Sequence, residues 1–234
     1  MSQSVLLHSL EHKDLRVIAE RGAAWGDDVM SSLTFPQEFR QVQAHYPIVF
    51  RATGDAAGFE ALALFGFERG ENLFLGPQGW DAAYVPLNIE RRPFLIGRHG
   101  DELNIHIDID HPRVSRTEGQ ELFLPHGGTG PYLERIHSVL LTLHQGLQAM
   151  PAFVAALTEH ALLESFVADI ELHDGSQHRL AGFYTINEER LQALPGAALE
   201  RLHRAGHLEP IHMVLASLSN FRDLIARRER RHAA

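Results

Sequence analysis

Short apolar runs separated by turn-forming residues dominate the first half of the chain. Residues 46–51 and 59–67 are too short and too uniformly apolar for amphipathic helices, which favours buried strands. Shorter apolar runs cover residues 5–7, 15–18, 73–75, 83–86, 94–98 and 103–109. Glycine and proline punctuate these runs, and the rhythm predicts an antiparallel, strongly curved sheet.

A different period appears after the glycine-rich segment 126–131. Apolar residues fall at positions 132, 133, 136, 139, 140, 143, 147 and 150, which lie on one face of a helix. Pro131 occupies the favoured first turn of this helix. Pro151 is expected to end the helix, or to kink it into a second one over residues 152–163, because proline lacks the backbone N–H that a helix interior requires.

Alternating apolar residues then predict a β-hairpin around residues 173–175. A three-residue loop there sets Asp169 opposite Arg179, whereas a two-residue loop would set the apolar face of one strand against polar residues of the other. The three-residue loop is therefore favoured. The predicted apolar face comprises Phe166, Ala168, Ile170, Leu172, Leu180, Tyr184 and Ile186.

Helices follow the hairpin, the first of them capped by Asn187. The last helix begins near Pro210, and its basic end at residues 227–231 is expected to be solvated and to fray. The pattern as a whole predicts an α+β fold in a single domain, with a curved antiparallel sheet in the N-terminal half and helices plus a β-hairpin in the C-terminal half. The β-rich part covers residues 1–126 and the helix-rich part covers residues 129–234.

Composition narrows the classes of function. The chain has 234 residues and a formal net charge of −9, which argues against a nucleic-acid-binding protein. It has no cysteine, so disulfides, thiolate metal sites and a cysteine nucleophile are excluded. The first residues lack the pattern of a signal peptide, and no uncharged apolar run approaches the length of a membrane span. A soluble, cytoplasmic protein is the expectation.

Several segments resemble the bacterial SapC-like family, and their order and spacing carry the resemblance over nearly the whole chain. They are His12-Lys-Asp-Leu-Arg16, Tyr46-Pro-Ile-Val-Phe50, Gly70-Glu-Asn-Leu-Phe74, Gly79-Trp80, Tyr84-Val-Pro86, Arg91-Arg92-Pro93-Phe94, Asp108, Gly182-Phe-Tyr-Thr-Ile186 with residues 188–194, and Leu215-Ala-Ser-Leu218.

The resemblance implies a role in the bacterial envelope. The family name derives from surface layers, and its members are often labelled peptide transporter permeases, although this chain shows neither a span nor an export signal in its sequence pattern. Genes for outer-membrane receptors and flavin-dependent halogenases tend to lie beside those of family members. This implies an accessory binding role in envelope uptake or peptide modification. Many relatives carry a cysteine near Asp108, where this chain has His106.

Aromatic and arginine side chains concentrate in the segment 72–92, and these types dominate binding sites. Two adjacent arginines suit an acidic group on a peptide or protein partner, because guanidinium groups bind oxyanions bidentately. The alternative is that one arginine forms an internal ion pair with Glu71 or Glu90 and the other is solvated. The candidate ligand- or partner-binding residues are Asn72, Trp80, Tyr84, Arg91 and Arg92.

A metal-dependent enzyme is the second hypothesis. His106, Asp108 and Asp110 alternate along one predicted strand and so share a face, and with His126 or His137 they would suit non-haem iron or zinc. The alternative is that the intervening isoleucines point inward and the polar set faces water. No serine lies in a nucleophile-elbow context. The favoured expectation is a binding protein without a cofactor.

Overall fold

The computed structural model describes residues 3–54, 58–99, 102–171, 175 and 177–232. Its contacts group the chain into two compact units, each built from segments that are distant in sequence. The first unit comprises Met1–Asp28, Leu75–Asp81 and Leu87–Gln145, and the second comprises Val29–Phe74, Ala82–Pro86 and Gly146–Ala234. The single domain stays a prediction.

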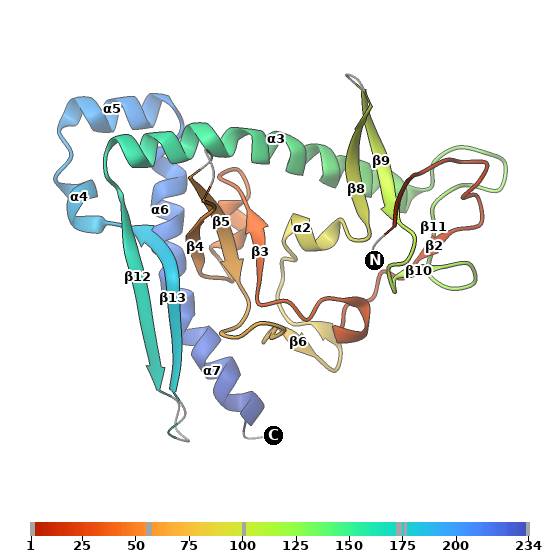
Figure 1. The fold of residues 1–234 in the computed structure, drawn as a ribbon, viewed down its shortest axis with the longest axis horizontal. Helices are drawn as coiled ribbons and strands as arrows, with labels where there is room; N and C mark the ends of the chain where they lie inside the picture. The colour runs from red at the N-terminus through yellow and green to blue at the C-terminus, as the bar shows by residue number, and fades with distance from the viewer. Residues whose placement is uncertain (1–2, 55–57, 100–101, 172–174, 176, 233–234) are drawn as a thin grey trace. The chain divides into compact units, whose positions relative to one another are not determined.

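The first unit contains small antiparallel sheets (Figure 1). One has the order β1 (Ser4–Leu6), β9 (Glu102–Asp108) and β8 (Phe94–His99), and a second has the order β10 (Val114–Ser115), β2 (Arg16–Val17) and β11 (Gln120–Glu121). Strands β6 (Leu75–Gly76) and β7 (Gly79–Trp80) form a two-stranded ribbon, and the short helices are η1 (Ala23–Trp25) and α2 (Leu87–Glu90).

An apolar cluster forms the core of the first unit. Ile107 of β9 pairs with Phe94 of β8, and neither side chain is exposed. Leu15 and Val17, from the segment that forms β2, pack in the same cluster as Leu133, Ile136 and Leu140 of the first half of helix α3. The sequence pattern explains why Leu133, Ile136 and Leu140 are buried together, because they lie on the apolar face of a helix with a 3.6-residue period.

The second unit is built on a five-stranded antiparallel sheet, in the order β12-β13-β4-β5-β3. The strands are β12 (Leu163–Glu171), β13 (Gln177–Ile186), β4 (Ile48–Ala52), β5 (Phe59–Leu64) and β3 (Ser31–Thr34). Residues 48–50 of β4 and 61–64 of β5 are buried, as their apolar runs predict. The hairpin from the C-terminal half thus joins the sheet through β13 and β4.

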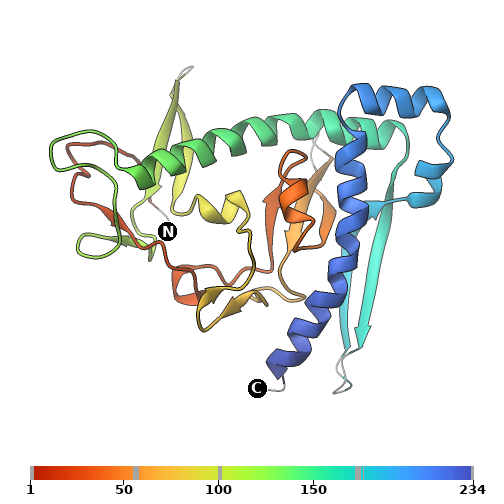
Figure 2. The same ribbon diagram turned by 180° about the vertical axis from the view of Figure 1, so that it is seen from behind.

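The helices of the second unit include α6 and α7, which run along the sheet (Figure 2). The described helices of this unit, apart from the end of α3, are α1 (Phe39–Val42), α4 (Glu188–Gln192), α5 (Gly196–Arg204), α6 (Leu208–Ser217), η2 (Leu218–Asn220) and α7 (Phe221–His232). Helix α6 packs against β13 and β4, and the rings of Phe166 and Phe221 lie 5.3 Å apart between β12 and α7. The predicted α+β class is confirmed.

Helix α3 (Pro131–Glu159) runs unbroken through Pro151, so the predicted end or second helix is wrong. The carbonyl that Pro151 leaves without a donor belongs to Leu147, and both residues are exposed, so water can satisfy it. By length and composition α3 would be sufficient to cross a bilayer, with 39% of its most apolar window buried. Core helices of globular proteins meet the same criterion, so this is weak evidence for a span.

The hairpin register is confirmed, because Asp169 pairs with Arg179 and Glu171 pairs with Gln177. Leu172 and most of the predicted loop lie outside the described residues. The predicted apolar face is wrong beyond Gly182, where two residues of β13 oppose one of β12 and the glycine has a φ of 83°. This bulge shifts the alternation by one residue. Phe183 therefore shares a face with Phe166, while Tyr184 and Ile186 lie on the opposite face.

The basic end of α7 is docked, which corrects the expectation that it frays. Arg228 forms ion pairs with Glu71 and, at 3.5 Å, with Glu68, and its side chain is only 15% exposed. The guanidinium of Arg227 lies 4.2 Å from the centre of the Phe74 ring. Carboxylates 157 and 160 residues away in sequence therefore hold this helix end.

Candidate functional site

The structure divides the predicted binding residues between the two units. Trp80, Arg91 and Arg92 belong to the first unit, and Asn72 and Tyr84 belong to the second. Their role in binding stays a prediction. Their local contacts show what each side chain does within its own unit.

Asn72 and Tyr84 both stabilise the second unit. Asn72 is 2% exposed, its Oδ1 accepts a hydrogen bond from the amide of Phe74 at 3.0 Å, and its carbonyl accepts one from Arg231 at 2.9 Å. The Tyr84 hydroxyl donates to the buried carboxylate of Glu38 at 2.9 Å. The hydrogen bonds to Arg231 of α7 and to Glu38, which precedes α1, join loops to helices, which is a structural role.

The two adjacent arginines are also engaged. Arg91 donates to the side chain of Asn88 at 2.9 Å and to the carbonyl of Phe94 at 2.7 Å. Arg92 donates to the carbonyl of Gly26 at 2.7 Å. Burial lowers the pKa of both guanidinium groups. The charge of Arg92 lowers the pKa of Arg91 further, whereas the carboxylate of Asp27 raises that of Arg92 and so offsets part of the effect of burial. The alternative of an ion pair with Glu71 or Glu90 is wrong, because these carboxylates pair with Arg228 and Arg135.

A buried ion pair lies close to Arg92 in the first unit. Arg113 and Asp27 are both fully buried, and Arg113 Nη2 donates to Asp27 Oδ2 at 2.5 Å. Arg21 approaches the other carboxylate oxygen at 3.6 Å. Burial lowers the pKa of Arg113, with the charge of Arg21 adding to the effect, while Asp27 raises it. An enclosed pair of this kind is costly to break, because either partner alone would be a buried charge.

The strand of the metal hypothesis places His106 and Asp108 on one face, opposite the buried Ile107. The ring of His106 lies across Gly97, where an added Cβ would come within 2.2 Å of it. Within the described ranges, no group of three or more histidine, aspartate or glutamate side chains is placed to hold a metal ion. The predicted distal ligands His126 and His137 are both exposed.

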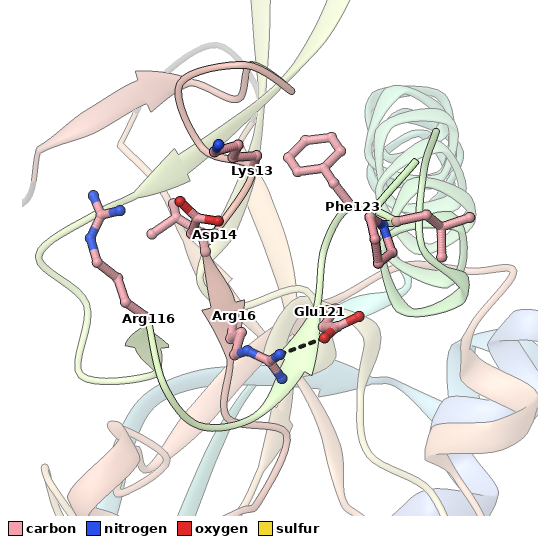
Figure 3. Close-up of a pocket in the computed structure, with 9 residues that line it drawn as sticks. Lys13, Asp14, Arg16, Arg116, Glu121 and Phe123 are labelled. Atoms are coloured by element: carbon pink, nitrogen blue, oxygen red, sulfur yellow. Dashed lines mark hydrogen bonds and ion pairs between the residues drawn. The ribbon is translucent and has the colours of Figure 1, made fainter. Parts of the chain in front are cut away.

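A charged pocket of about 330 Å³ lies in the first unit, and sequence reasoning did not find it (Figure 3). The loop before β2 contributes Lys13 and Asp14, and Arg116 and Phe123 come from segments flanking β11. Figure 3 shows Asp14 in the middle, with Arg116 on one side and the Phe123 ring on the other. Leu124 contributes an apolar side chain that is 46% exposed.

The charges in this pocket differ in how they are satisfied. Arg16 pairs with Glu121 and also donates to the carbonyl of Gly119 at 3.2 Å. Lys13 and Arg116 are exposed, and neither has an ion pair among the residues that the structure describes. The pocket therefore presents two unengaged cations and one carboxylate beside an aromatic ring.

One sequence signal pointed to this place. The segment His12-Lys-Asp-Leu-Arg16 is among those that carry the family resemblance, and its last four residues line the pocket. The other wall comes from residues about a hundred positions away, as the hydrogen bond from Arg16 to Gly119 shows. Local pattern cannot reveal that juxtaposition.

Comparison with known proteins identifies the family. The model of the SapC family matches residues 7–224, which is nearly the whole chain. The chain belongs to the SapC family. No curated protein matches it, and no solved structure matches it. Membership of the SapC family confirms the resemblance.

Proposed function

We propose that this SapC family member is a binding protein that recognises an acidic peptide segment of a partner in the pocket of its first unit. The observation that carries the proposal is the pair of exposed cations, Lys13 and Arg116, which line one pocket without an ion pair among the described residues. A carboxylate placed between them would gain charge-assisted hydrogen bonds.

The other lining residues suit a peptide rather than a simple anion. Asp14 also lines the pocket, and its carboxylate can accept the backbone N–H groups of a peptide. Phe123 and Leu124 offer apolar surface against which the aliphatic part of a peptide side chain can pack. The local positive charge is also an exception on a chain with a formal net charge of −9, so it favours a ligand of opposite sign.

The pair Arg91 and Arg92 is the competing surface for the same ligand. Their guanidinium groups already donate to Asn88, Phe94 and Gly26, so binding there would replace existing hydrogen bonds. Replacing existing hydrogen bonds gains less binding free energy than forming new ones with the unengaged cations of the pocket. An accessory role in envelope uptake or peptide modification, as the SapC resemblance implies, is compatible with peptide recognition of this kind.

Fluorescence anisotropy with the full chain tests the proposal. The probe is a fluorescein-labelled hexapeptide with one aspartate among glycines and serines, and the reference probe has asparagine in that position. We expect the aspartate probe to bind about tenfold more tightly than the asparagine probe, the gain of one charge-assisted contact. The preference should shrink as salt is raised, because exposed charges are screened.

Variants locate the site. Lys13→Gln with Arg116→Gln should abolish the preference for aspartate, while Arg222→Gln, which changes an exposed arginine of the second unit, should leave it intact. Equal affinity for the two probes would refute the proposal. Loss of the preference in Arg92→Gln, with the double variant still binding normally, would instead place the site at the arginine pair.

A further inference from the structure

A second pocket of about 300 Å³ adjoins the charged one in the first unit. The two share Leu15 and Arg116, so these side chains form the wall between them. Only His12 and Arg116 in its lining are ionisable. The two pockets therefore differ in chemistry while lying next to each other.

The second pocket is mainly apolar. Ile109 and Val114 line it and are half-buried, and both pack against the apolar cluster that contains Leu15. Surface of this kind gains from covering by an apolar side chain, since each methylene removed from water is favourable. Ser115, His12 and Arg116 supply the polar atoms of its lining.

We propose that the acidic peptide of the proposed function carries an apolar side chain two residues from its carboxylate, and that this side chain enters the second pocket. In an extended peptide, residues i and i+2 point to the same side, about 6.6 Å apart. Two pockets that share the side chains of Leu15 and Arg116 suit two side chains that leave an extended peptide on the same side. The inference rests on the proposed function, because the charged pocket must first hold the carboxylate.

The experiment extends the anisotropy assay to a set of labelled peptides on the wild-type chain. One probe has aspartate followed two positions later by leucine, a second has serine in place of leucine, and a third has the leucine moved to the adjacent position. We expect the first probe to bind about tenfold more tightly than the second, the effect of burying most of one leucine side chain. The third should bind no better than the second.

Two protein variants check the place of the leucine. Ile109→Thr and Val114→Thr each put a hydroxyl into the apolar pocket, and each should weaken the leucine probe while leaving the serine probe unchanged. Thermal unfolding shows whether the variants fold. The ligand series needs no variant, so the inference stays testable even if both substitutions disturb the core.

The outcomes separate the two proposals. Equal binding of the leucine and serine probes, both tighter than the asparagine reference, would overturn the inference and leave the proposed function standing. Equal binding of the two leucine spacings would overturn the inference as well, because the gain would then be non-specific. Failure of every aspartate probe to exceed the asparagine reference would refute the proposed function itself.

Discussion

Replacing Gly146 by alanine should destabilise the protein, although helix propensity alone favours the change. Gly146 lies within α3, and a Cβ added there would come within 2.1, 2.3 and 2.6 Å of atoms of the Phe35 ring. Ordinary contacts of a Cβ begin near 3.4 Å. Phe35 is 1% exposed, so its ring has no solvent to move into.

Two effects of opposite sign decide the magnitude. Alanine in place of glycine inside a helix stabilises it by about 1 kcal/mol. Forcing an extra methyl group into a packed core costs about 1–3 kcal/mol. The overlap exceeds 1 Å for the closest ring atom, which places this case toward the upper end of that cost. We expect a net loss of about 1–2 kcal/mol and a Tm lower by several degrees, at about 2–4 °C per kcal/mol for a chain of this size.

Urea unfolding followed by circular dichroism measures the loss. Gly196→Ala is the matched control, since Gly196 lies in the first turn of α5 and an added Cβ there meets nothing within 4 Å. This control should be neutral or slightly stabilising. In the Phe35→Leu background, Gly146→Ala should cost less, because the ring atoms are gone. If Gly146→Ala stabilises the protein, the packing argument is refuted, because the gain in helix propensity would then exceed the cost of the overlap with Phe35.

Three further changes test other parts of the structure. Asp27→Asn should cost about 3–5 kcal/mol in urea unfolding, because it leaves the buried guanidinium of Arg113 without its charge partner. Ser217→Ala should cost about 1–3 kcal/mol, because the buried hydroxyl accepts a hydrogen bond from an amide of β4. His111→Asn should flatten the loss of stability on acidification. Burial, and then the charge of Arg113, lower the pKa of His111 below its ordinary 6.5, so the unfolded chain binds more protons and stability falls as the pH drops below about 6.5.

Each of these has its own control or contrary result. Glu60→Gln removes an exposed ion pair with Arg51 and should cost no more than about 1 kcal/mol, so a loss as large as that of Asp27→Asn would contradict the burial argument. The Ser217 hydroxyl also donates to the carbonyl of Val214 at 2.6 Å, and the exposed hydroxyl of Ser219 donates in the same way to the carbonyl of Ala216 at 2.8 Å. Equal losses in Ser217→Ala and Ser219→Ala would show that burial of the hydroxyl does not matter. Parallel stability curves of the wild type and His111→Asn between pH 7.5 and pH 5.5 would exclude His111 as a source of the pH dependence.

Local pattern predicted the elements where one face of a strand or helix is buried. The Asp169–Arg179 register was predictable because side chains alternate with a period of two, which a slip of one residue would invert. The bulge at Gly182 was not predictable from the sequence, because glycine adopts either sign of φ and only the pairing with β12 selects one of them. The unbroken course of α3 through Pro151 was not predictable for a similar reason. A helix tolerates an internal proline where the carbonyl that loses its donor faces water, and only the tertiary structure decides which side of α3 is exposed.

The candidate site was less predictable than the fold. The partners of Glu71 and Glu90 come from residues 157 and 45 positions away, and a carboxylate's choice among distant arginines leaves no local trace. Adjacent Arg91 and Arg92 looked available in the sequence, yet backbone and side-chain oxygens engage them. Lys13 and Arg116 are ordinary surface residues in the sequence, and only the pairing of β2 with β10 and β11 brings their segments together.

The sequence by itself determined the α+β class, the helix of the apolar stripe after Pro131, the hairpin register and membership of the SapC family. These depend on periodicity and on the order of short segments, which neighbouring residues encode. Only the tertiary structure decided how the strands join into sheets, which carboxylate each arginine meets, and which cations stay unengaged. Such pairings form between residues far apart in the chain, where sheet register and helix packing set the distances that charge and burial depend on.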